Sequence, residues 1–211
     1  MLTFSHLDIG YATRRVATDL SGTLPQGSFT ALVGRNGSGK STLLRTLAGL
    51  QKPLAGEIEL NGKALASYSS KDLARQRAIV LTHVEEVAAL TVEQMVETGR
   101  TPYTNLTGKL SENDREVVRK ALETTKLEDL RSTPVTELSD GQRQRVFIAT
   151  ALAQDTPILF LDEPSAYLDY ESREALFTLL KRLAEEEKKC ILCSTHDLDF
   201  VRRFDLTTIS L

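Results

Sequence analysis

The chain has 211 residues, a length that fits one domain with a sizeable hydrophobic core, or one domain with an inserted subdomain. Apolar residues make up 41% and charged residues 26% of the chain, and the formal net charge of −3 gives no indication of a nucleic-acid-binding surface. No apolar run approaches the roughly 18 residues of a membrane span, and the N-terminus does not resemble a signal peptide, so a role at a membrane would require a partner.

Strand-like and helix-like patterns alternate along the chain. Apolar patterns typical of strands occur at residues 2–11, 14–24, 27–34, 56–63, 78–82, 157–163 and 190–195. The strand at 56–63 is expected to be antiparallel and to end at an Asn-Gly turn. The last three segments are compact apolar runs, which suit central parallel strands covered on both faces.

Helical patterns occur between the first and second of these three compact apolar runs, that is, between 78–82 and 157–163. We expect helices at 92–100, 112–127 and 142–154, and in the second of them one apolar stripe is formed by Val117, Val118, Ala121 and Leu122. The sequence therefore predicts an α/β core at 1–83 and 155–211. The core is interrupted by a helical insertion at 84–154, which has the size of a small subdomain.

Residues Gly34–Thr42 read "GRNGSGKST" and match the phosphate-binding pattern G-x-x-x-x-G-K-[ST], between an expected strand and an expected helix. Glycines in such a loop let successive backbone N–H groups converge on phosphate oxygens, and the positive end of the helix dipole adds to the attraction. Lys40 is expected to reach the β- and γ-phosphates of a nucleotide, and the Ser41 hydroxyl to coordinate Mg²⁺. The expected nucleotide-binding residues of the loop are Gly34, Asn36, Gly37, Ser38, Gly39, Lys40, Ser41 and Thr42.

Two more strands are expected to end beside this loop, because ligands of parallel sheets bind beyond the carboxyl ends of the strands. Asp162 and Glu163 end the run "PILFLDE", and Asp162 is expected to hold Mg²⁺ directly or through water. Glu163 could orient and deprotonate an attacking water molecule. His196 follows the run 190–195 and could hydrogen-bond the γ-phosphate or the same water.

Cys190 and Cys193 are the two cysteines of the chain, and with His196 they resemble a metal-binding cluster. Residues three apart on a strand point to opposite faces, which argues against a shared metal. We therefore interpret both as buried small residues, and two cysteines give no disulfide framework.

Together these motifs resemble the ATP-binding subunit of an ABC transporter, and the resemblance covers essentially the whole chain. Gly34–Thr42 is similar to the Walker A motif of that family. The segment "ILFLDE" is similar to its Walker B motif, in which Glu163 would be the catalytic glutamate. His196 resembles the switch histidine, and "AYLD", ending in Asp169, resembles the D-loop.

The resemblance implies ATP and Mg²⁺ as ligands. It also implies a P-loop NTPase (RecA-like) fold, with a parallel sheet core, an antiparallel β subdomain and an inserted helical subdomain. Tyr11 matches the aromatic residue that stacks on adenine in this family, although a tyrosine packed beside a hairpin is the alternative interpretation.

The segment "LSDGQ" resembles the family's signature motif and precedes a helix in whose first turns Arg143 and Arg145 lie. A capping box of Ser139 and Gln142 explains part of this pattern. The resemblance implies further that the Ser139 hydroxyl and the Gly141 N–H contact the γ-phosphate held by a second subunit. The residues assigned to this contact are Ser139, Asp140, Gly141 and Gln142.

Two positions depart from the family pattern. Asp140 replaces the usual second glycine of the signature, and we expect its carboxylate to turn outward, towards Arg143. His83 stands where the family has a glutamine that contacts Mg²⁺ or water and senses the permease. Because imidazole lacks the paired donor and acceptor of an amide, our hypothesis is that His83 keeps the sensing role with a weaker metal contact. Gln76 and Gln94 take that role only if the alignment is displaced.

Within the family, Gly99–Pro102 and Gly108–Asp114 resemble segments of importers of ferric siderophores, haem or cobalamin. Such importers usually continue beyond "LTTISL", so a truncated form and a shortened natural tail both fit this chain.

The resemblance implies an ATPase on the cytoplasmic face of the cytoplasmic membrane, attached there through permease subunits. The other implied partners are a second copy of the chain and, indirectly, a periplasmic or lipoprotein substrate-binding protein; no nucleic acid is expected. An exporter subunit and an ABC ATPase that acts outside transport are the alternatives.

Overall fold

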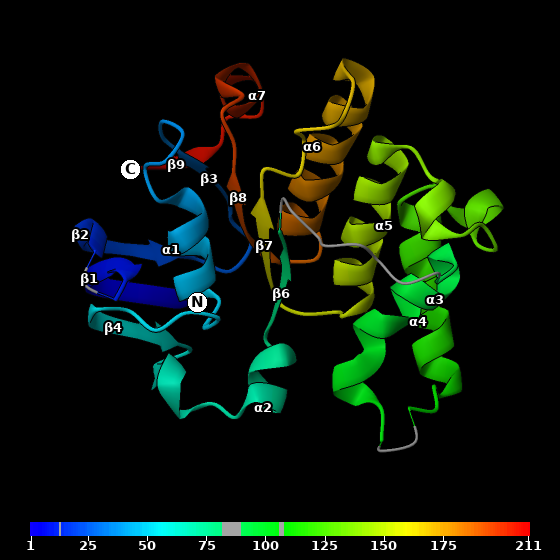
Figure 1. The fold of residues 1–211 in the computed structure, drawn as a ribbon, viewed down its shortest axis with the longest axis horizontal. Coiled ribbons are helices and arrows are strands. Elements are labelled where there is room, and N and C mark those ends of the chain that lie inside the picture. Colours follow the sequence, from blue (N-terminus) through cyan, green and yellow to red (C-terminus); the bar gives the residue numbers. More distant parts are fainter. Residues whose placement is uncertain (13, 82–89, 106–107) are drawn as a thin grey trace.

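The computed structural model describes residues 1–12, 14–81, 90–105 and 108–211, and it contains two β-sheets with helices around them (Figure 1). One sheet is antiparallel with strand order β2-β1-β4-β5, and the other is parallel with order β6-β7-β8-β3-β9. The strands are β1 Leu2–Tyr11, β2 Arg14–Leu24, β3 Phe29–Val33, β4 Ala55–Leu60, β5 Lys63–Ala64, β6 Arg77–Val80, β7 Ile158–Asp162, β8 Cys190–Ser194 and β9 Thr207–Ser210.

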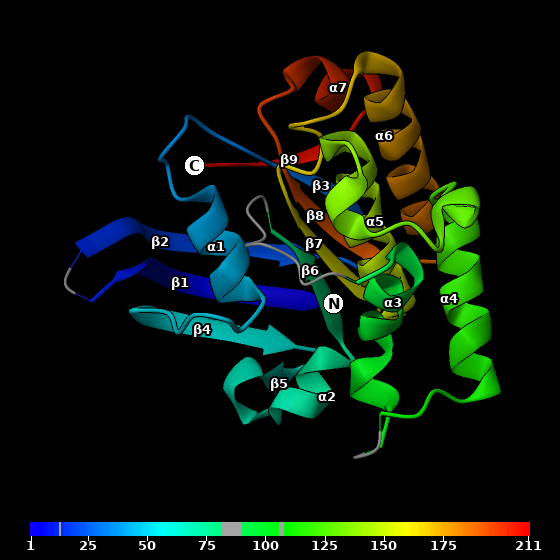
Figure 2. The same ribbon diagram turned by 45° about the vertical axis from the view of Figure 1, so that its right-hand side comes forward.

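The helices lie mostly at the side of the parallel sheet that is remote from the antiparallel sheet (Figures 1 and 2). They are α1 Lys40–Leu47, α2 Ser70–Ala74, α3 Val92–Glu97, α4 Glu112–Thr124, α5 Asp140–Ala153, α6 Tyr170–Glu185 and α7 Leu198–Arg203. Short 3₁₀ turns occupy η1 Leu65–Ser67, η2 Thr98–Tyr103, η3 Glu128–Leu130 and η4 Val135–Glu137. Among the described residues no helix is both long and apolar enough to cross a membrane.

The antiparallel sheet follows from alternating side chains. In β1, Leu2 and Phe4 are buried while Ser5 is exposed, and Leu2 lies opposite Leu24 of β2 and Leu60 of β4. The turn after β4 has positive φ at both Asn61 (53°) and Gly62 (75°), which confirms the predicted Asn-Gly turn.

Two of the three compact apolar runs form central strands of the parallel sheet, β7 and β8, as predicted. The third, β6, lies at the edge of the sheet instead, and only its Ala78 and Val80 are buried. All five residues of β7 and all five of β8 are buried. These two strands pair in register, so that Asp162 lies opposite Ser194 at their carboxyl ends. The polar residues that follow the strands are therefore delivered to one edge of the sheet.

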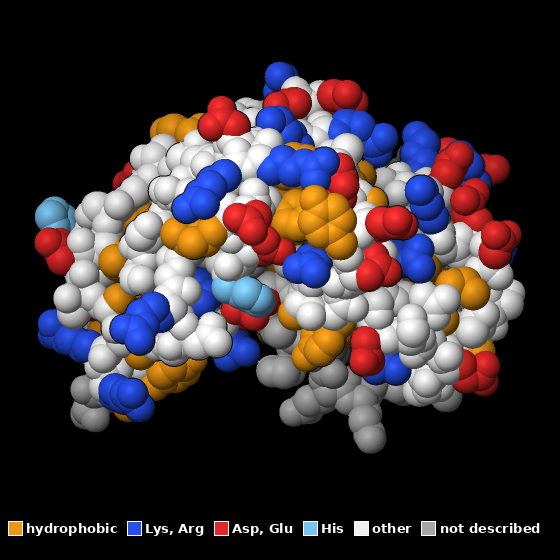
Figure 3. Space-filling view, turned by 90° about the horizontal axis from the view of Figure 1, so that it is seen from above, with side chains coloured by type: hydrophobic (Ala, Val, Ile, Leu, Met, Phe, Trp, Pro, Cys, Tyr) orange, Lys and Arg blue, Asp and Glu red, His pale blue; other side chains and the backbone are white. Residues whose placement is uncertain are grey.

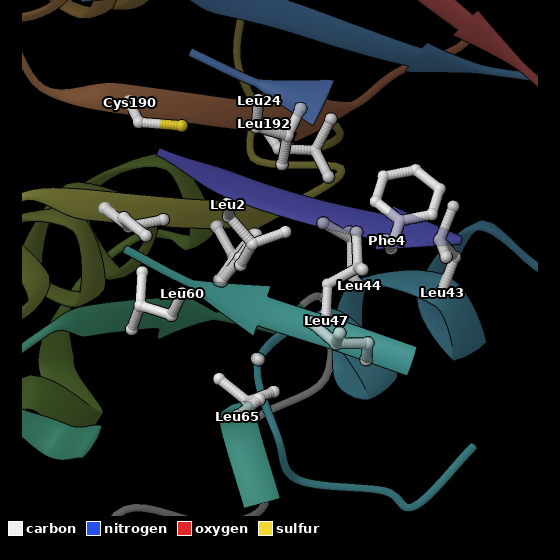
Figure 4. Packing of buried hydrophobic residues seen from close by; sticks show 14 of the residues in the cluster. Leu2, Phe4, Leu24, Leu43, Leu44, Leu47, Leu60, Leu65, Cys190 and Leu192 are labelled. Atoms are coloured by element: carbon white, nitrogen blue, oxygen red, sulfur yellow. The ribbon is translucent and has the colours of Figure 1, made fainter. Parts of the chain in front are cut away.

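Three hydrophobic clusters hold these layers together. The first lies between the two sheets around α1 and includes Leu2, Leu44, Leu60 and Leu192 (Figure 4). The second covers the other face of the parallel sheet beneath α6 and α7. The third joins only the helical part at 92–153, where α3 and α4 both pack on α5. The helical part therefore has a hydrophobic core of its own.

Candidate nucleotide-binding site

A pocket of about 490 Å³ lies where the N-terminus of α1 meets the carboxyl end of β7. Figure 3 looks onto this end of the molecule, where acidic, basic and apolar side chains are interspersed. The pocket is lined by Tyr11, Arg14, Val16, Asn36, Gly37, Gly39, Lys40, Ser41, Thr42, Arg45, Asp162 and Glu163. Most of the predicted nucleotide-binding residues therefore come together in one place.

The N-terminus of α1 is built to receive an anion. Its N-cap, Gly39, has φ of 108° and no side chain to satisfy the first N–H groups, and no acidic residue lies in the first turn. A Cβ at Gly39 would lie 2.6 Å from Cγ1 of Val16, so this position requires glycine. Gly37, with φ of 79°, has open space beside it. These N–H groups and the helix dipole thus face the pocket without a competing carboxylate from α1 itself.

Lys40 is buried, and its ammonium group is held by the loop that precedes it. The Nζ atom donates to the carbonyl oxygens of Gly34 at 3.0 Å and Arg35 at 3.2 Å, and it lies 3.9 Å from Oε1 of Glu163. Ser38 contributes a buried Oγ with no hydrogen-bond partner among the described residues. The loop thus places the cation of Lys40 at the pocket, whereas Ser38 and Gly34, two of the predicted binding residues, do not line it.

Ser194 joins the two acidic residues, and sequence reasoning missed it. Its Oγ donates to Oδ1 of Asp162 at 2.7 Å and accepts from the backbone N–H of Glu163 at 2.9 Å. This contact holds the backbone of Glu163 at a positive φ of 47°. A polar residue at the carboxyl end of an otherwise apolar strand was the signal that could have identified it.

His196 lies at the edge of this group of residues. Its side chain is 63% exposed, and Nδ1 is 3.9 Å from Oε2 of Glu163, beyond hydrogen-bond distance. The structure thus brings His196 close to the proposed base, although His196 does not line the pocket.

Tyr11 lines the pocket from the end of β1. Its side chain is 51% exposed, and its hydroxyl oxygen accepts a hydrogen bond from Oγ1 of Thr42 at 3.4 Å. An exposed ring anchored to the phosphate loop can stack on a nucleotide base.

The oxygen ligands at the pocket fit a Mg²⁺ ion that the protein and the nucleotide phosphates would bind together. The Ser41 hydroxyl and the Asp162 carboxylate both line the pocket, and Mg²⁺ commonly uses one or two such groups together with phosphate oxygens and water. Within the described part of the chain no cluster of three or more His, Cys, Asp or Glu side chains could hold a metal alone. The third assigned ligand, His83, lies outside the described residues.

The signature residues lie away from this pocket, at the start of α5. Oγ of Ser139 accepts from the Gln142 N–H at 3.3 Å, and Oε1 of Gln142 accepts from the Ser139 N–H at 3.0 Å, so the predicted capping box is confirmed. Asp140 has a 70% exposed side chain and lies 3.4 Å from Arg143, as expected. At Gly141 a Cβ would meet only ordinary contacts at 3.5 Å.

Asp169 also lies outside the pocket and caps α6. Its carboxylate accepts from the Ser172 N–H at 2.7 Å, and this backbone hydrogen bond is the main cause that holds the pKa of Asp169 below its ordinary value.

The two cysteines lie on opposite faces of the parallel sheet, as predicted: Cys190 belongs to the cluster around α1 and Cys193 to the cluster beneath α6. Burial raises the pKa of the Cys190 thiol to about 11 and that of Cys193 further still. Both are therefore poor metal ligands and poor nucleophiles in the folded protein.

A two-sheet fold with a phosphate loop, a strand ending in Asp-Glu and a helical part with its own core defines the ATP-binding cassette class of P-loop ATPases. In agreement, a family model described as ABC transporter matches residues 17–166, and the chain belongs to this family.

Relatives and solved structures extend this result. The chain is 42% identical to the iron(3+)-hydroxamate import ATP-binding protein of Bacillus subtilis, over 100% of this chain and 78% of the relative. It is 38% identical to the ferric enterobactin transport ATP-binding protein of Escherichia coli, over 97% of this chain and 76% of the relative. A solved dimeric ATP-binding cassette in a post-hydrolysis state, bound to ADP and Pi, superposes with a TM-score of 0.87 at 28% identity, over 100% of this chain and 94% of that chain.

Proposed function

We propose that this chain hydrolyses ATP to power an importer of ferric siderophores at the cytoplasmic face of the cytoplasmic membrane. The observation that carries the ATPase assignment is the single pocket in which the N-terminus of α1, Lys40, Asp162 and Glu163 meet. Of the three cargoes that the sequence motifs suggest, siderophores are favoured, because the two relatives described above are named for iron(3+)-hydroxamate import and for ferric enterobactin transport.

The proposed roles follow from the geometry. Tyr11 stacks on the base, the N–H groups at the start of α1 bind the phosphate oxygens, and Lys40 turns from the loop carbonyls to the terminal phosphates. Mg²⁺, held by Ser41 and Asp162, would supply further positive charge at the phosphate oxygens when bound. Glu163 takes a proton from the attacking water, and His196 orients that water or the γ-phosphate.

In the proposed mechanism, the signature residues of a second copy of the chain complete the ATP-binding site. Ser139 and Gly141 do not line the pocket of their own chain, although the resemblance assigns them to a γ-phosphate. A head-to-tail pair of subunits brings each signature to the pocket of the other. We assign the helical part to residues 84–154 and propose that the permease docks on it. Closure of the pair would then move this docking surface.

The test of the ATPase assignment is Glu163→Gln, which keeps the size of the side chain but removes the base. We expect nucleotide binding to persist while turnover falls about 100-fold or more, the usual contribution of a general base. ATP binding is measured by fluorescence titration with a labelled analogue and turnover by phosphate release. Glu59→Gln is the control, because Glu59 is exposed on β4, outside the lining of the pocket. Unchanged turnover in Glu163→Gln would remove Glu163 as the base.

The cargo is tested separately, with the subunit assembled on the permease that co-purifies with it. Vesicles containing this complex should take up a labelled ferric siderophore only when ATP is supplied on the subunit's side. Uptake of haem or cobalamin alone would reassign the cargo, and ATP-driven movement in the opposite direction would indicate an exporter.

A further inference from the structure

Residues on both sides of His196 are fixed to different parts of the fold. On one side, the Thr195 N–H donates to the carbonyl oxygen of Leu32 in β3 at 3.1 Å. On the other side, Oδ2 of Asp197 lies 2.9 Å from Nη1 of Arg173, in the first turn of α6. The imidazole itself is mostly exposed, so these two backbone neighbours, rather than packing of the ring, determine where it lies.

In the ion pair between Arg173 and Asp197, the aspartate contacts Arg173 instead of capping its own helix. Asp197 is the N-cap of α7, a position where an aspartate carboxylate usually accepts from its own helix, but here it makes no such hydrogen bond. Its carboxylate is turned to Arg173 and is mostly buried, with 15% of the side chain exposed. A partly buried pair of this kind is better defined than one on the surface.

Arg173 provides a rigid anchor for this contact. Its helix, α6, packs on the parallel sheet through buried residues that include Phe177 and Leu180. Helix α7 is held against α6 independently, since the ring of Phe177 lies 5.1 Å from that of Phe200 and 5.7 Å from that of Phe204. The ion pair is therefore not needed to keep α7 in place, and its distinct effect falls on the residue next to His196.

We propose that Arg173 is a positioning residue for ATP hydrolysis, which acts through Asp197 to hold His196 beside Glu163. This inference rests on the proposed roles of His196 and Glu163. Helix α6 also follows directly on the loop that begins at Glu163 and is capped by Asp169. The pair thus joins the first turn of α6, which follows the loop after β7, to the residue next to His196 in the loop after β8.

The experiment compares Arg173→Gln with the wild-type full chain in steady-state ATPase assays. A displaced His196 affects chemistry more than binding, so we expect kcat to fall about tenfold while KM for ATP stays within about twofold. Asp197→Asn removes the same ion pair from its other partner, and it should likewise lower kcat while leaving KM for ATP nearly unchanged. Arg173→Lys keeps the charge and should recover part of kcat.

Arg203→Gln is the matched control, because Arg203 also links α7 to α6, through the Tyr170 hydroxyl and Glu174, but does not touch Asp197. It should leave kcat within about twofold of wild type even if thermal stability falls. A loss of kcat in Arg203→Gln equal to that in Arg173→Gln would show that any tether between α6 and α7 suffices, and would overturn the proposal.

The His196→Ala background separates this inference from the proposed function. If Arg173 acts through His196, adding Arg173→Gln to His196→Ala should cause no further loss of kcat. An additional tenfold loss, about the size of the single effect, would mean that Arg173 acts elsewhere. By contrast, full turnover in His196→Ala alone would contradict the assigned role of His196, and with it the proposed mechanism, whatever Arg173→Gln does.

Discussion

At the scale of single residues, the hydroxyl group of Ser194 connects the two acidic residues of the pocket. It is buried, donates to Asp162 and accepts from the N–H of Glu163. Asp162 is proposed to bind the metal ion and Glu163 to be the base, so one side chain sets the position of both. The strand pairing of β7 with β8 brings these residues together, although 31 positions separate Ser194 from Glu163.

Replacing Ser194 with alanine should therefore affect both stability and activity. The buried carboxylate of Asp162 loses a donor and the N–H of the half-buried Glu163 loses its acceptor, which costs about 1–3 kcal/mol of folding free energy. Turnover should fall as well, because the backbone of Glu163 is no longer held at its positive φ. Urea unfolding and phosphate release measure the two effects. Ser210→Ala, at an exposed position of β9, should change neither; equal stability of Ser194→Ala and wild type would contradict the assigned hydrogen bonds.

At the scale of elements, the two segments that resemble siderophore importers are joined inside the helical part. Nε and Nη2 of Arg100 lie 2.9 and 2.8 Å from Oδ1 of Asp114, and Nη1 donates to the carbonyl oxygen of Ala153 at 2.8 Å. A Cβ at Gly99 would lie 2.3 Å from the carbonyl oxygen of Thr150, so glycine permits the close approach of η2 to α5. In this chain the two motifs thus tie η2, α4 and α5 together.

Breaking this buried pair should destabilise the protein in a pH-dependent way. Asp114→Asn leaves the Arg100 guanidinium buried without its counter-charge, a change that costs about 3 kcal/mol at neutral pH. Hydrogen bonds from Ser111, then Arg100, hold the pKa of Asp114 below its ordinary value. A lowered pKa gives stability that is present above the ordinary pKa of about 3.9 and is lost as the pH falls below it, so the difference between variant and wild type should shrink there.

Chemical unfolding at a series of pH values measures this difference. Glu116→Gln is the control, since Glu116 lies on the same helix but pairs with Arg119 at the exposed surface. If the difference in free energy of unfolding between Asp114→Asn and wild type stayed constant below pH 4, the assigned pairing would be contradicted.

At the scale of the whole molecule, the pocket of one chain contains the phosphate loop, Asp162 and Glu163 but not the signature residues. The start of α5 already has its capping box, so its own structure does not require a further anion. In the proposed head-to-tail pair, the signature residues of a second chain would contact the γ-phosphate and close the pocket.

This arrangement predicts that Gly141→Glu abolishes pairing but not folding. The site has room for a side chain, and glutamate favours a helix more than glycine does. A carboxylate there would repel the γ-phosphate of a second chain. In the Glu163→Gln background, sedimentation velocity should show an ATP-dependent dimer that Gly141→Glu eliminates. Thr178→Glu, exposed on α6, adds the same charge elsewhere and should leave the dimer intact. Persistence of the dimer with Gly141→Glu would contradict a γ-phosphate contact at the signature.

The sequence by itself determined the features that depend on neighbours along the chain. Compact apolar runs located β7 and β8, an apolar stripe located α4, the Asn-Gly pair located a turn, and the order of residues in Gly34–Thr42 located the phosphate loop. The three-residue spacing of Ser139 and Gln142 identified the capping box, and the same spacing on a strand predicted that Cys190 and Cys193 lie on opposite faces of the sheet. These are local properties, because dihedral preferences and strand or helix periods act over a few residues.

Only the tertiary structure decided which distant groups meet. The contacts of Ser194 with Glu163, Arg173 with Asp197 and Arg100 with Ala153 each join separate elements. No local pattern distinguishes Arg173 from Arg182 on the same helix, yet Arg173 alone of the two is paired with a carboxylate within the described residues. The physical reason is that such contacts depend on strand order and helix packing, which place residues far apart in the chain within hydrogen-bond distance.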